Sequence, residues 1–432
     1  MQKQERLLYV LVLVILVGSA AAGIATTGLV PSLKGLWDIQ SHPARLLNDF
    51  TQATNDGAAL LNAALVALFG LALIRINRVR LSGPTIAAVF TLFGFGLFGK
   101  TPLNILPIMT GVYIAARIAR KEFREYIIIA LFGTALGPLV SLLAVELARP
   151  PLLQIPIAVF AGLLAGIVLP AAAIVMLRLH QGYNLYNIGL TTGFIALFAA
   201  AVVFGQGKQL AGGSVWNSQP SLLLQWLIPT ISALLILAGL SAGRMDALRS
   251  FRRILKLPGR LPSDFMDMET VAGSLVNMGV MGIALWGYVV LVGADLSGPV
   301  LGGLLTVMGF AAFGKHPANV WPVLVGVMLA AVTFDQDLFA RGVILGALFG
   351  TTLAPLAGQF GIPIGILAGF LHLSIVMRSG AWHAGIGLYN NGFAGGLTAT
   401  LLLAVIEWYR TNNPTATPAR AGSMASFRKD RT

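Results

Sequence analysis

The chain has 432 residues, of which 56% are hydrophobic and only 10% are charged, and it contains no cysteine. A soluble domain carries about 25% charged residues, so this composition excludes a chain that covers its whole surface with charge. The lack of cysteine excludes disulfides, thiolate catalysis, iron–sulfur clusters and thiolate zinc sites. Long apolar stretches, each bounded by Arg, Lys, Gly or Pro, instead predict an all-α polytopic membrane protein whose partner is the lipid bilayer.

The apolar stretches predict ten spanning helices and two pairs of short helices. The spanning helices are expected near residues 7–30, 57–76, 126–146, 152–177, 188–205, 221–242, 269–292, 342–361, 362–378 and 392–408. The short helices are expected at 84–98 with 103–117 and at 299–313 with 318–333. The first stretch could also be a secretory signal peptide, but its apolar run continues to Val30, which favours a retained helix.

The basic residues predict the orientation of the chain in the membrane. Apart from Lys100 and Lys315 there are 27 Lys and Arg residues, and with the N-terminus inside, 21 of them fall inside and 6 outside. The positive-inside rule therefore places both termini in the cytoplasm. The same distribution accounts for the net charge of +13, so no nucleic-acid partner is expected.

The sequence contains an internal repeat. Residues 83–116 align without a gap to residues 298–331, with 15 of the 34 positions identical. A second motif, His-x-Gly-x-x-Leu-Tyr-Asn-x-Gly, begins at His180 and recurs at His383. The chain is therefore interpreted as a duplication. Its predicted domains are repeat 1 over residues 1–215, repeat 2 over 216–410, and a disordered basic cytoplasmic tail over 411–432.

The two repeats are predicted to have opposite orientations in the membrane. Each contains five spanning helices, an odd number, and one short pair that crosses an even number of times. The flanking charges agree, because the first pair lies near the basic Arg80 and Arg117 and the second near the acidic Asp295 and Asp335. Inverted-topology repeats are a construction typical of transporters and channels. If the short helices also span, the total is 14 helices.

The short pairs are predicted to form re-entrant helical hairpins over residues 84–117 and 299–333. Each member has about 15 residues, whereas a full span needs about 20. Pro102 and Pro317 suit the first turn of the returning helix. The two tips are expected to approach the midplane from opposite faces. Two tilted helices of full length are the alternative.

The principal candidate site residues are Lys100 and Lys315 at the hairpin tips, because an intramembrane ammonium group is costly and usually functional. No intramembrane carboxylate is apparent, and the adjacent helix N-termini favour an anion. The candidate substrate-binding set comprises Gly99, Lys100, Thr101, Asn104, Gly314, Lys315, His316, Asn319, Asn62, Asn277, His180, Tyr186, Asn187, His383, Tyr389 and Asn390.

Structural roles are open alternatives for part of this set. Asn62 and Asn277 could join helices by hydrogen bonds rather than bind a solute. The second motif could form an interfacial loop with turn glycines and an aromatic anchor, or His180 could relay a proton. The histidines lack metal-ligand spacing, so no metal site is expected.

The paired Phe-Gly-Lys-x-Pro-x-Asn-x-x-Pro and Leu-Tyr-Asn-x-Gly motifs resemble an uncharacterised family of bacterial membrane proteins, known as a domain of unknown function. The resemblance covers about Asp49 to Trp408 and implies a duplicated protein of the bacterial inner membrane, without an activity. The architecture is similar to that of elevator-type anion transporters, although none of their motifs is present. Residues 387–392 resemble the Asn-Gly stretches of urea transporters, whose Leu-Pro-rich filter signature is absent.

These features favour a secondary transporter that moves a small polar or anionic solute by alternating access around the two tips. The alternative is a facilitative urea-like channel for a small neutral solute. An enzyme is not expected, because no Walker A sequence is apparent and the nearest acidic pair, Asp264 and Asp267, has only Asp49 as its match in the other half. No cofactor is expected beyond a coupling ion, H+ or Na+. Self-association into a homo-oligomer is left open.

Overall fold

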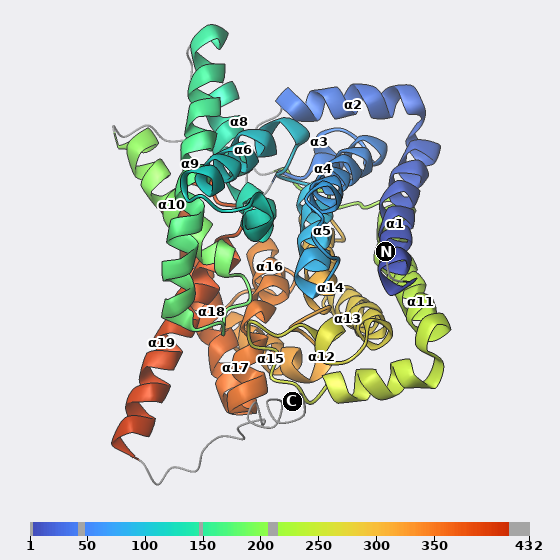
Figure 1. Ribbon diagram of the computed structural model, residues 1–432, viewed down its shortest axis with the longest axis vertical. Helices are drawn as coiled ribbons and strands as arrows, with labels where there is room; N and C mark the ends of the chain where they lie inside the picture. The colour runs from blue at the N-terminus through green and yellow to red at the C-terminus, as the bar shows by residue number, and fades with distance from the viewer. Residues whose placement is uncertain (1–2, 42–47, 147–149, 206–214, 414–432) are drawn as a thin grey trace.

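The computed structural model describes residues 3–41, 48–146, 150–205 and 215–413 (Figure 1). All regular secondary structure in these ranges is helical. Ten of the described helical segments are long and apolar enough to cross a membrane, and four shorter apolar helices accompany them. The predicted class of an all-α polytopic membrane protein is therefore confirmed. The predicted tail lies outside the described residues from 414 onward.

The helices occur in the same order in the two halves of the chain. Repeat 1 contains α1 (Lys3–Thr27), α2 (Leu29–Ser41), α3 (Phe50–Ala53), α4 (Asp56–Ile76), α5 (Gly83–Phe95), α6 (Pro102–Ile118), α7 (Ile127–Gly133), α8 (Gly137–Val145), α9 (Pro151–His180) and α10 (Asn187–Phe204). Repeat 2 contains α11 (Leu222–Ile254), α12 (Phe265–Met268), α13 (Val271–Leu291), α14 (Gly298–Phe310), α15 (Pro317–Thr333), α16 (Arg341–Gly350), α17 (Ala354–Phe360), α18 (Ile362–Trp382) and α19 (Asn390–Asn412). From α3 and α12 onward, each helix has its counterpart.

Two features of the ends of the molecule were not predicted. The first apolar stretch stops at Thr27, because Gly28 has a φ of +94°, and the chain continues as α2. This helix buries only Ser32, Gly35 and Ile39 and leaves Trp37 75% exposed. At the other end of the view, α11 bends at Arg244, where the backbone is not helical. Its last part runs across the molecule much as α2 does (Figure 1).

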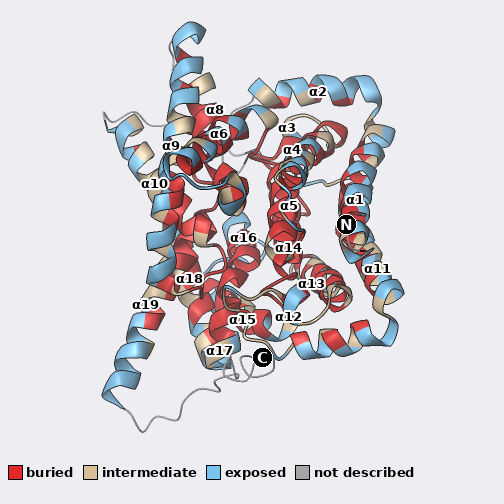
Figure 2. Ribbon diagram, in the orientation of Figure 1, coloured by how far each residue is buried: buried red, intermediate tan, exposed pale blue. Residues whose placement is uncertain are grey.

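Helices α5 and α14 form the buried centre (Figure 2). All residues of α14, and all of α5 except Pro84, are buried. The pair is antiparallel, since Gly94 of α5 contacts Gly302 of α14 while Gly309 of α14 contacts Ala87 of α5. A Cβ atom at Gly94 would lie 2.6 Å from the Gly302 carbonyl oxygen. Equivalent helices thus run in opposite directions, as inverted repeats require.

The turns that join the two short helices of each pair, called the tips, lie at opposite ends of α5 and α14. Gly83, where α5 begins, contacts Phe313 at the second tip, and Gly298, where α14 begins, contacts Leu97 at the first tip. A helix of 13 residues is about 20 Å long, so the tips are separated by roughly that distance. The expectation that the tips approach each other at the midplane was wrong, because the antiparallel helices lie between them.

The helix after each short pair is broken. A 3-10 turn, η2 (Thr134–Leu136), separates α7 from α8, and η3 (Thr351–Leu353) separates α16 from α17. A proline follows each turn in the first turn of the next helix. These breaks face the second sequence motif of the opposite repeat. The last helices of the repeats, α10 and α19, meet where Gly189 and Gly392 are in contact, and these are equivalent positions.

Candidate functional site

Each tip is a tight turn held by an asparagine from the preceding long helix, α4 or α13. The backbone N–H groups of Gly99 and Lys100 both donate to the Phe95 carbonyl at 2.9 Å. The Asn62 amide donates to the carbonyls of Gly96 and Lys100 at 2.7 and 2.8 Å. In repeat 2 the Asn277 amide does the same for Ala311 and Lys315, at 2.8 and 2.7 Å. The donors of Asn62 and Asn277 therefore hold the tip backbone.

The returning helices begin with matching caps. Pro102 and Pro317 occupy the first helical position, as predicted. Thr101 and Asn104 cap each other's backbone N–H groups, and His316 and Asn319 form the same reciprocal box. The amide nitrogens of Asn104 and Asn319 also donate to the tip carbonyls of Gly99 and Gly314, at 3.1 and 3.0 Å.

Both lysines are fully buried and each donates to a tyrosine of the other repeat. Lys100 Nζ donates to the Tyr389 hydroxyl, and Lys315 Nζ to the Tyr186 hydroxyl, each at 2.6 Å. The ammonium groups also lie over the rings of these tyrosines, 4.7 and 4.3 Å from the ring centroids. Such cation–π contacts strengthen as water is removed. Two Lys–Tyr sites are thus built, each from residues of both repeats.

The lysines have no acidic partner within the described ranges of the chain. Among the residues that the structure describes, no carboxylate forms an ion pair with Lys100 or Lys315. Lys315 has a second acceptor, the Thr351 hydroxyl of η3, at 2.8 Å. The equivalent Thr134 hydroxyl donates to Leu131 and makes no hydrogen bond to Lys100. The two sites therefore contain equivalent residues, but only Lys315 bonds to the threonine of the neighbouring broken helix.

The second sequence motif forms a buried loop that presents each tyrosine. His180 Nε2 lies 3.0 Å from Asn187 Oδ1, and His383 Nε2 lies 3.0 Å from Asn390 Oδ1. These four side chains tie the loop to the preceding helix. His180, His383 and Asn390 are buried and Asn187 is partly buried, so the loop packs inside the protein.

The same loops join the tips to the broken helices. The backbone N–H of Leu185 donates to the Thr352 carbonyl, and that of Leu388 donates to the Ala135 carbonyl, each at 3.1 Å. A Cβ atom at Gly99 would meet the Leu388 side chain at 2.5 Å. The glycine at the tip is needed for this close approach. Gly314 packs against Leu185 in the same way.

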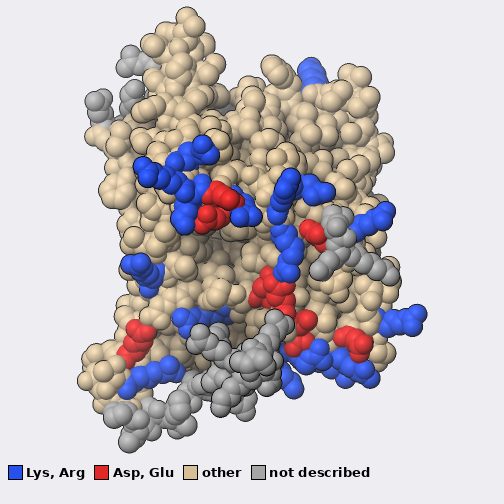
Figure 3. All heavy atoms as spheres, viewed as in Figure 1, with Lys and Arg blue, Asp and Glu red and all other residues tan. Residues whose placement is uncertain are grey.

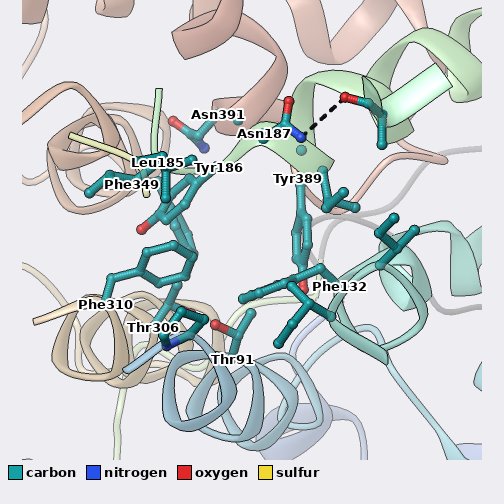
Figure 4. Close-up of a pocket in the computed structure, with 18 of the residues that line it drawn as sticks. Thr91, Phe132, Leu185, Tyr186, Asn187, Thr306, Phe310, Phe349, Tyr389 and Asn391 are labelled. Carbon is teal, nitrogen blue, oxygen red and sulfur yellow. Dashed lines mark hydrogen bonds between the residues drawn. The ribbon is translucent and has the colours of Figure 1, made fainter. Parts of the chain in front are cut away.

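A cavity of about 250 Å³ lies between the two tyrosine loops (Figure 4). Equivalent residues from both repeats line it, in the pairs Thr91 and Thr306, Phe95 and Phe310, Phe132 and Phe349, Leu185 and Leu388, Tyr186 and Tyr389, and Gly189 and Gly392. Of the predicted residues, Tyr186, Tyr389 and Asn187 reach this lining. The lysines lie behind the tyrosines, and the histidines and the other asparagines of the predicted set support them.

The cavity is not symmetric. Its lining continues on one side along repeat 1, through Pro84, Ile128, Ile129, Ala173, Ile174 and Leu177, and ends at Leu261. The repeat 2 counterparts of Pro84, Ile128 and Ala173 are Pro299, Leu345 and Val376, which are buried and do not line it. The cavity thus extends toward the end of the molecule where α5 begins and is closed toward the end where α14 begins.

The comparison with protein families agrees with the duplicated architecture. The family model described as "Protein of unknown function (DUF1576)" matches residues 30–204 and 244–408. The chain belongs to this family. The DUF1576 matches fall one in each repeat, which confirms the predicted resemblance to an uncharacterised duplicated family. No curated protein and no solved structure matches the chain.

Two aspartates that are not among the predicted site residues anchor the DUF1576 repeats to each other. The Asp264 carboxylate accepts from the Gly83 N–H at 3.1 and 3.2 Å, and Asp49 Oδ2 accepts from the Gly298 N–H at 2.9 Å. Each aspartate thus caps the first short helix of the other repeat, where a negative charge is favourable. The equal spacing of Asp49 and Asp264 from these glycines was the available signal.

The anchoring carboxyl groups are partly desolvated. Burial raises the pKa of Asp264 to about 6, and the nearby Asp267 carboxylate adds to the rise, against the backbone N–H groups that bond Asp264. Burial also raises the pKa of Asp49, which hydrogen bonds from Thr51, Gly298 and Asn217 oppose. These groups connect the repeats and do not touch the cavity. Among the described residues, no group of three or more His, Asp or Glu could hold a metal ion.

Proposed function

We propose that this protein is a secondary transporter that moves a small polar or anionic solute by alternating access. The observation that carries the proposal is the crossed pair of buried Lys–Tyr contacts, Lys100 with Tyr389 and Lys315 with Tyr186, at the edge of a cavity between inverted repeats. Buried cations without acidic partners are expensive in a membrane and mark functional sites. Transporters commonly bind substrate at the interface of such repeats, beside discontinuous helices.

We assign the two short pairs to re-entrant hairpins of a bacterial inner-membrane protein. Helices of 13 and 17 residues reach only about 20 to 25 Å, less than the ~30 Å hydrocarbon core. Both termini are assigned to the cytoplasm. In Figure 3, charged side chains gather over the middle and lower part of the visible face, while the upper part, where α2 lies, has almost none. This distribution supports the orientation derived from the positive-inside rule.

With this orientation, the open side of the cavity faces the cytoplasm. Pro84 and Leu261 at its mouth flank the basic segments on that side. The inverted repeats imply a second conformation in which repeat 2 adopts the present arrangement of repeat 1. In that conformation Leu345 would line the mouth, and the mouth would open outward. A closed side also favours a transporter over the urea-like channel, which needs a continuous path.

Single-cysteine variants at equivalent positions test this proposal, because the parent chain has no cysteine. Ile128→Cys should react with a membrane-impermeant maleimide from the cytoplasmic side, in inside-out vesicles. Leu345→Cys, 6% exposed here, should react from the outside in intact cells, and more slowly, as the outward state is sampled. If Leu345→Cys never reacts while Ile128→Cys does, the structure has one open side only and alternating access is contradicted.

A further inference from the structure

One polar side chain of the cavity lining lacks a hydrogen-bond partner. Thr91 is 2% exposed, and its hydroxyl makes no hydrogen bond to any residue that the structure describes. The equivalent Thr306 hydroxyl donates to the Gly302 carbonyl at 2.7 Å. Figure 4 shows both threonines at one end of the cavity, with the Thr91 oxygen directed inward. A buried hydroxyl without a partner costs free energy, so its position points to a ligand that supplies the missing bond.

Tyr389, which lines the same cavity, offers a hydrogen-bond donor. Thr91 lies one helical turn before Phe95, whose ring centroid is 4.7 Å from that of Tyr389. The Tyr389 oxygen accepts from Lys100, and its own O–H finds no acceptor among the described residues. An ammonium group that donates to a phenol polarises the phenol O–H and makes it a stronger donor. The free groups at this end therefore suit the oxygen of an anion.

A further unpaired donor lies at the opposite end of the cavity. The Asn391 side-chain oxygen lies 3.1 Å from His372 Nε2, and its amide nitrogen has no acceptor in the part of the chain that the structure describes. Figure 4 shows Asn391 well separated from Thr91. Each of the unpaired polar groups in this cavity can therefore donate a hydrogen bond: the Tyr389 O–H, the Asn391 amide and the Thr91 hydroxyl. Carboxylate side chains are absent from the lining.

The rest of the lining is apolar, with both aliphatic and aromatic side chains. Five phenylalanines line the cavity, Phe95 and Phe132 from repeat 1 and Phe310, Phe313 and Phe349 from repeat 2. The volume of about 250 Å³ is below the usual ~300–1,000 Å³ of small-molecule sites. An apolar wall favours a solute whose own apolar surface leaves water on binding. It offers a strongly hydrated polar solute few hydrogen-bond partners. The occupant is therefore small and has an apolar body.

We infer that the cavity binds a small organic monoanion, a carboxylate on an apolar and preferably aromatic body. The carboxylate lies at the Tyr389 and Thr91 hydroxyls, and Lys100 behind Tyr389 supplies the compensating charge. The apolar body lies between the phenylalanines of the two repeats. This narrows the solute class of the proposed transporter and rests on that function for its biological role. Binding itself is measurable without transport.

Thermal unfolding of the purified full-length protein in detergent tests the inference, because a ligand that binds the folded state raises its stability by mass action. The probes are benzoate, benzamide and acetate at equal concentrations and constant ionic strength. Benzoate should raise the midpoint. Benzamide, which has the same shape without charge, and acetate, which has the carboxylate without the ring, should each bind at least tenfold more weakly. Equal shifts from benzamide, equal shifts from acetate, or no shift from benzoate would each overturn the inference.

Variants of one residue place the carboxylate. Thr91→Val should weaken benzoate binding by about tenfold, the effect of losing one hydrogen bond to a charged group. Thr91→Ser keeps the hydroxyl and should restore binding. Thr306→Val, whose hydroxyl is already bonded to the backbone, should cause a smaller loss. If Thr91→Val binds benzoate as the parent does, the assigned position is wrong. If benzoate binds as expected but is not exchanged across a membrane, the inference stands and the transport proposal fails.

Discussion

The ammonium group of Lys100 donates a 2.6 Å hydrogen bond to the hydroxyl of Tyr389, a residue 289 positions further along the chain. The lysine belongs to repeat 1 and the tyrosine to repeat 2. Lys315 and Tyr186 repeat the contact with the roles exchanged. Each site is therefore incomplete within a single repeat, and any movement of one repeat against the other acts directly on both lysines.

The unequal partners of the two lysines predict unequal effects of removing the tyrosine hydroxyls. Tyr389→Phe removes the one acceptor that the described residues offer to the buried Lys100 Nζ, which should cost about 1.5–3 kcal/mol of stability. Tyr186→Phe should cost less, because Lys315 keeps Thr351 at 2.8 Å. Thermal unfolding in detergent measures both. Equal losses, or a larger loss for Tyr186→Phe, would show that the Lys315–Thr351 contact contributes nothing.

The sequence predicted the helices and the chemical groups of this site better than their contacts. Lys100 and Tyr389 were both predicted as site residues, because an intramembrane lysine and a repeated Leu-Tyr-Asn motif can be recognised from the sequence alone. Their pairing was not predicted, since it depends on how the inverted halves cross. Thr91 was missed because a threonine in an apolar helix usually bonds its own backbone, as Thr306 does. Its lack of a partner is a tertiary property.

The asparagines show the opposite case, in which a residue was identified and its role was not. Asn62 and Asn277 were candidates for solute binding, with helix joining as the alternative. In the structure their amides hold the tip carbonyls of Lys100 and Lys315. The residue type was informative because an intramembrane amide must bond to something. Which carbonyl it reaches depends on the turn geometry, and sequence spacing alone does not define it.

The raised pKa of Asp264 predicts a pH dependence of stability. The folded state holds this proton up to about pH 6, whereas an unfolded aspartate loses it near pH 4. The native state binds more protons in this window, so its stability should fall as the pH rises from about 4 to 6. Asp264→Asn retains an acceptor for Gly83 and Met266 and removes the charge near Asp267 and Arg80. The fall should therefore be smaller in this variant.

Midpoints of thermal unfolding at pH 4, 5, 6 and 7 provide the measurement. Asp246→Asn is the control, because Asp246 is exposed and its one ion pair among the described residues is with Arg249 on its own helix. An identical pH profile for Asp264→Asn and the parent would mean that Asp264 titrates normally.

The contact between Gly189 and Gly392 predicts a steric effect at the crossing of the two last helices. A Cβ atom at Gly189 would lie 2.8 Å from the Gly392 Cα, and the reverse substitution gives the same distance. Gly189→Ala and Gly392→Ala should each destabilise the protein by about 1–3 kcal/mol, the range for overpacking. Gly287→Ala has open space around its Cβ and should be neutral or stabilising. If all three behave alike in thermal unfolding, α10 and α19 do not cross here.

The assigned orientation predicts the labelling of two exposed positions. Asp246→Cys should be protected from an impermeant maleimide in intact cells, and Gln336→Cys should react. Asp246 is preferred to Ser250 of the same segment, because Ser250 is buried and its Oγ accepts a hydrogen bond from the Thr270 hydroxyl at 2.9 Å. Reaction of Asp246→Cys from outside, with Gln336→Cys protected, would reverse the topology and with it the side to which the cavity opens.

Counterflow of labelled benzoate in proteoliposomes is the most direct test of the transport account. Vesicles preloaded with unlabelled benzoate should accumulate the label transiently and saturably. Lys100→Met and Lys315→Met should fold, because each loses the desolvation cost of a buried charge, and their exchange should fall by roughly tenfold or more, the worth of a charge-assisted contact. Parental exchange in both variants, or label entry without any dependence on preloaded benzoate, would contradict alternating access around the two lysines.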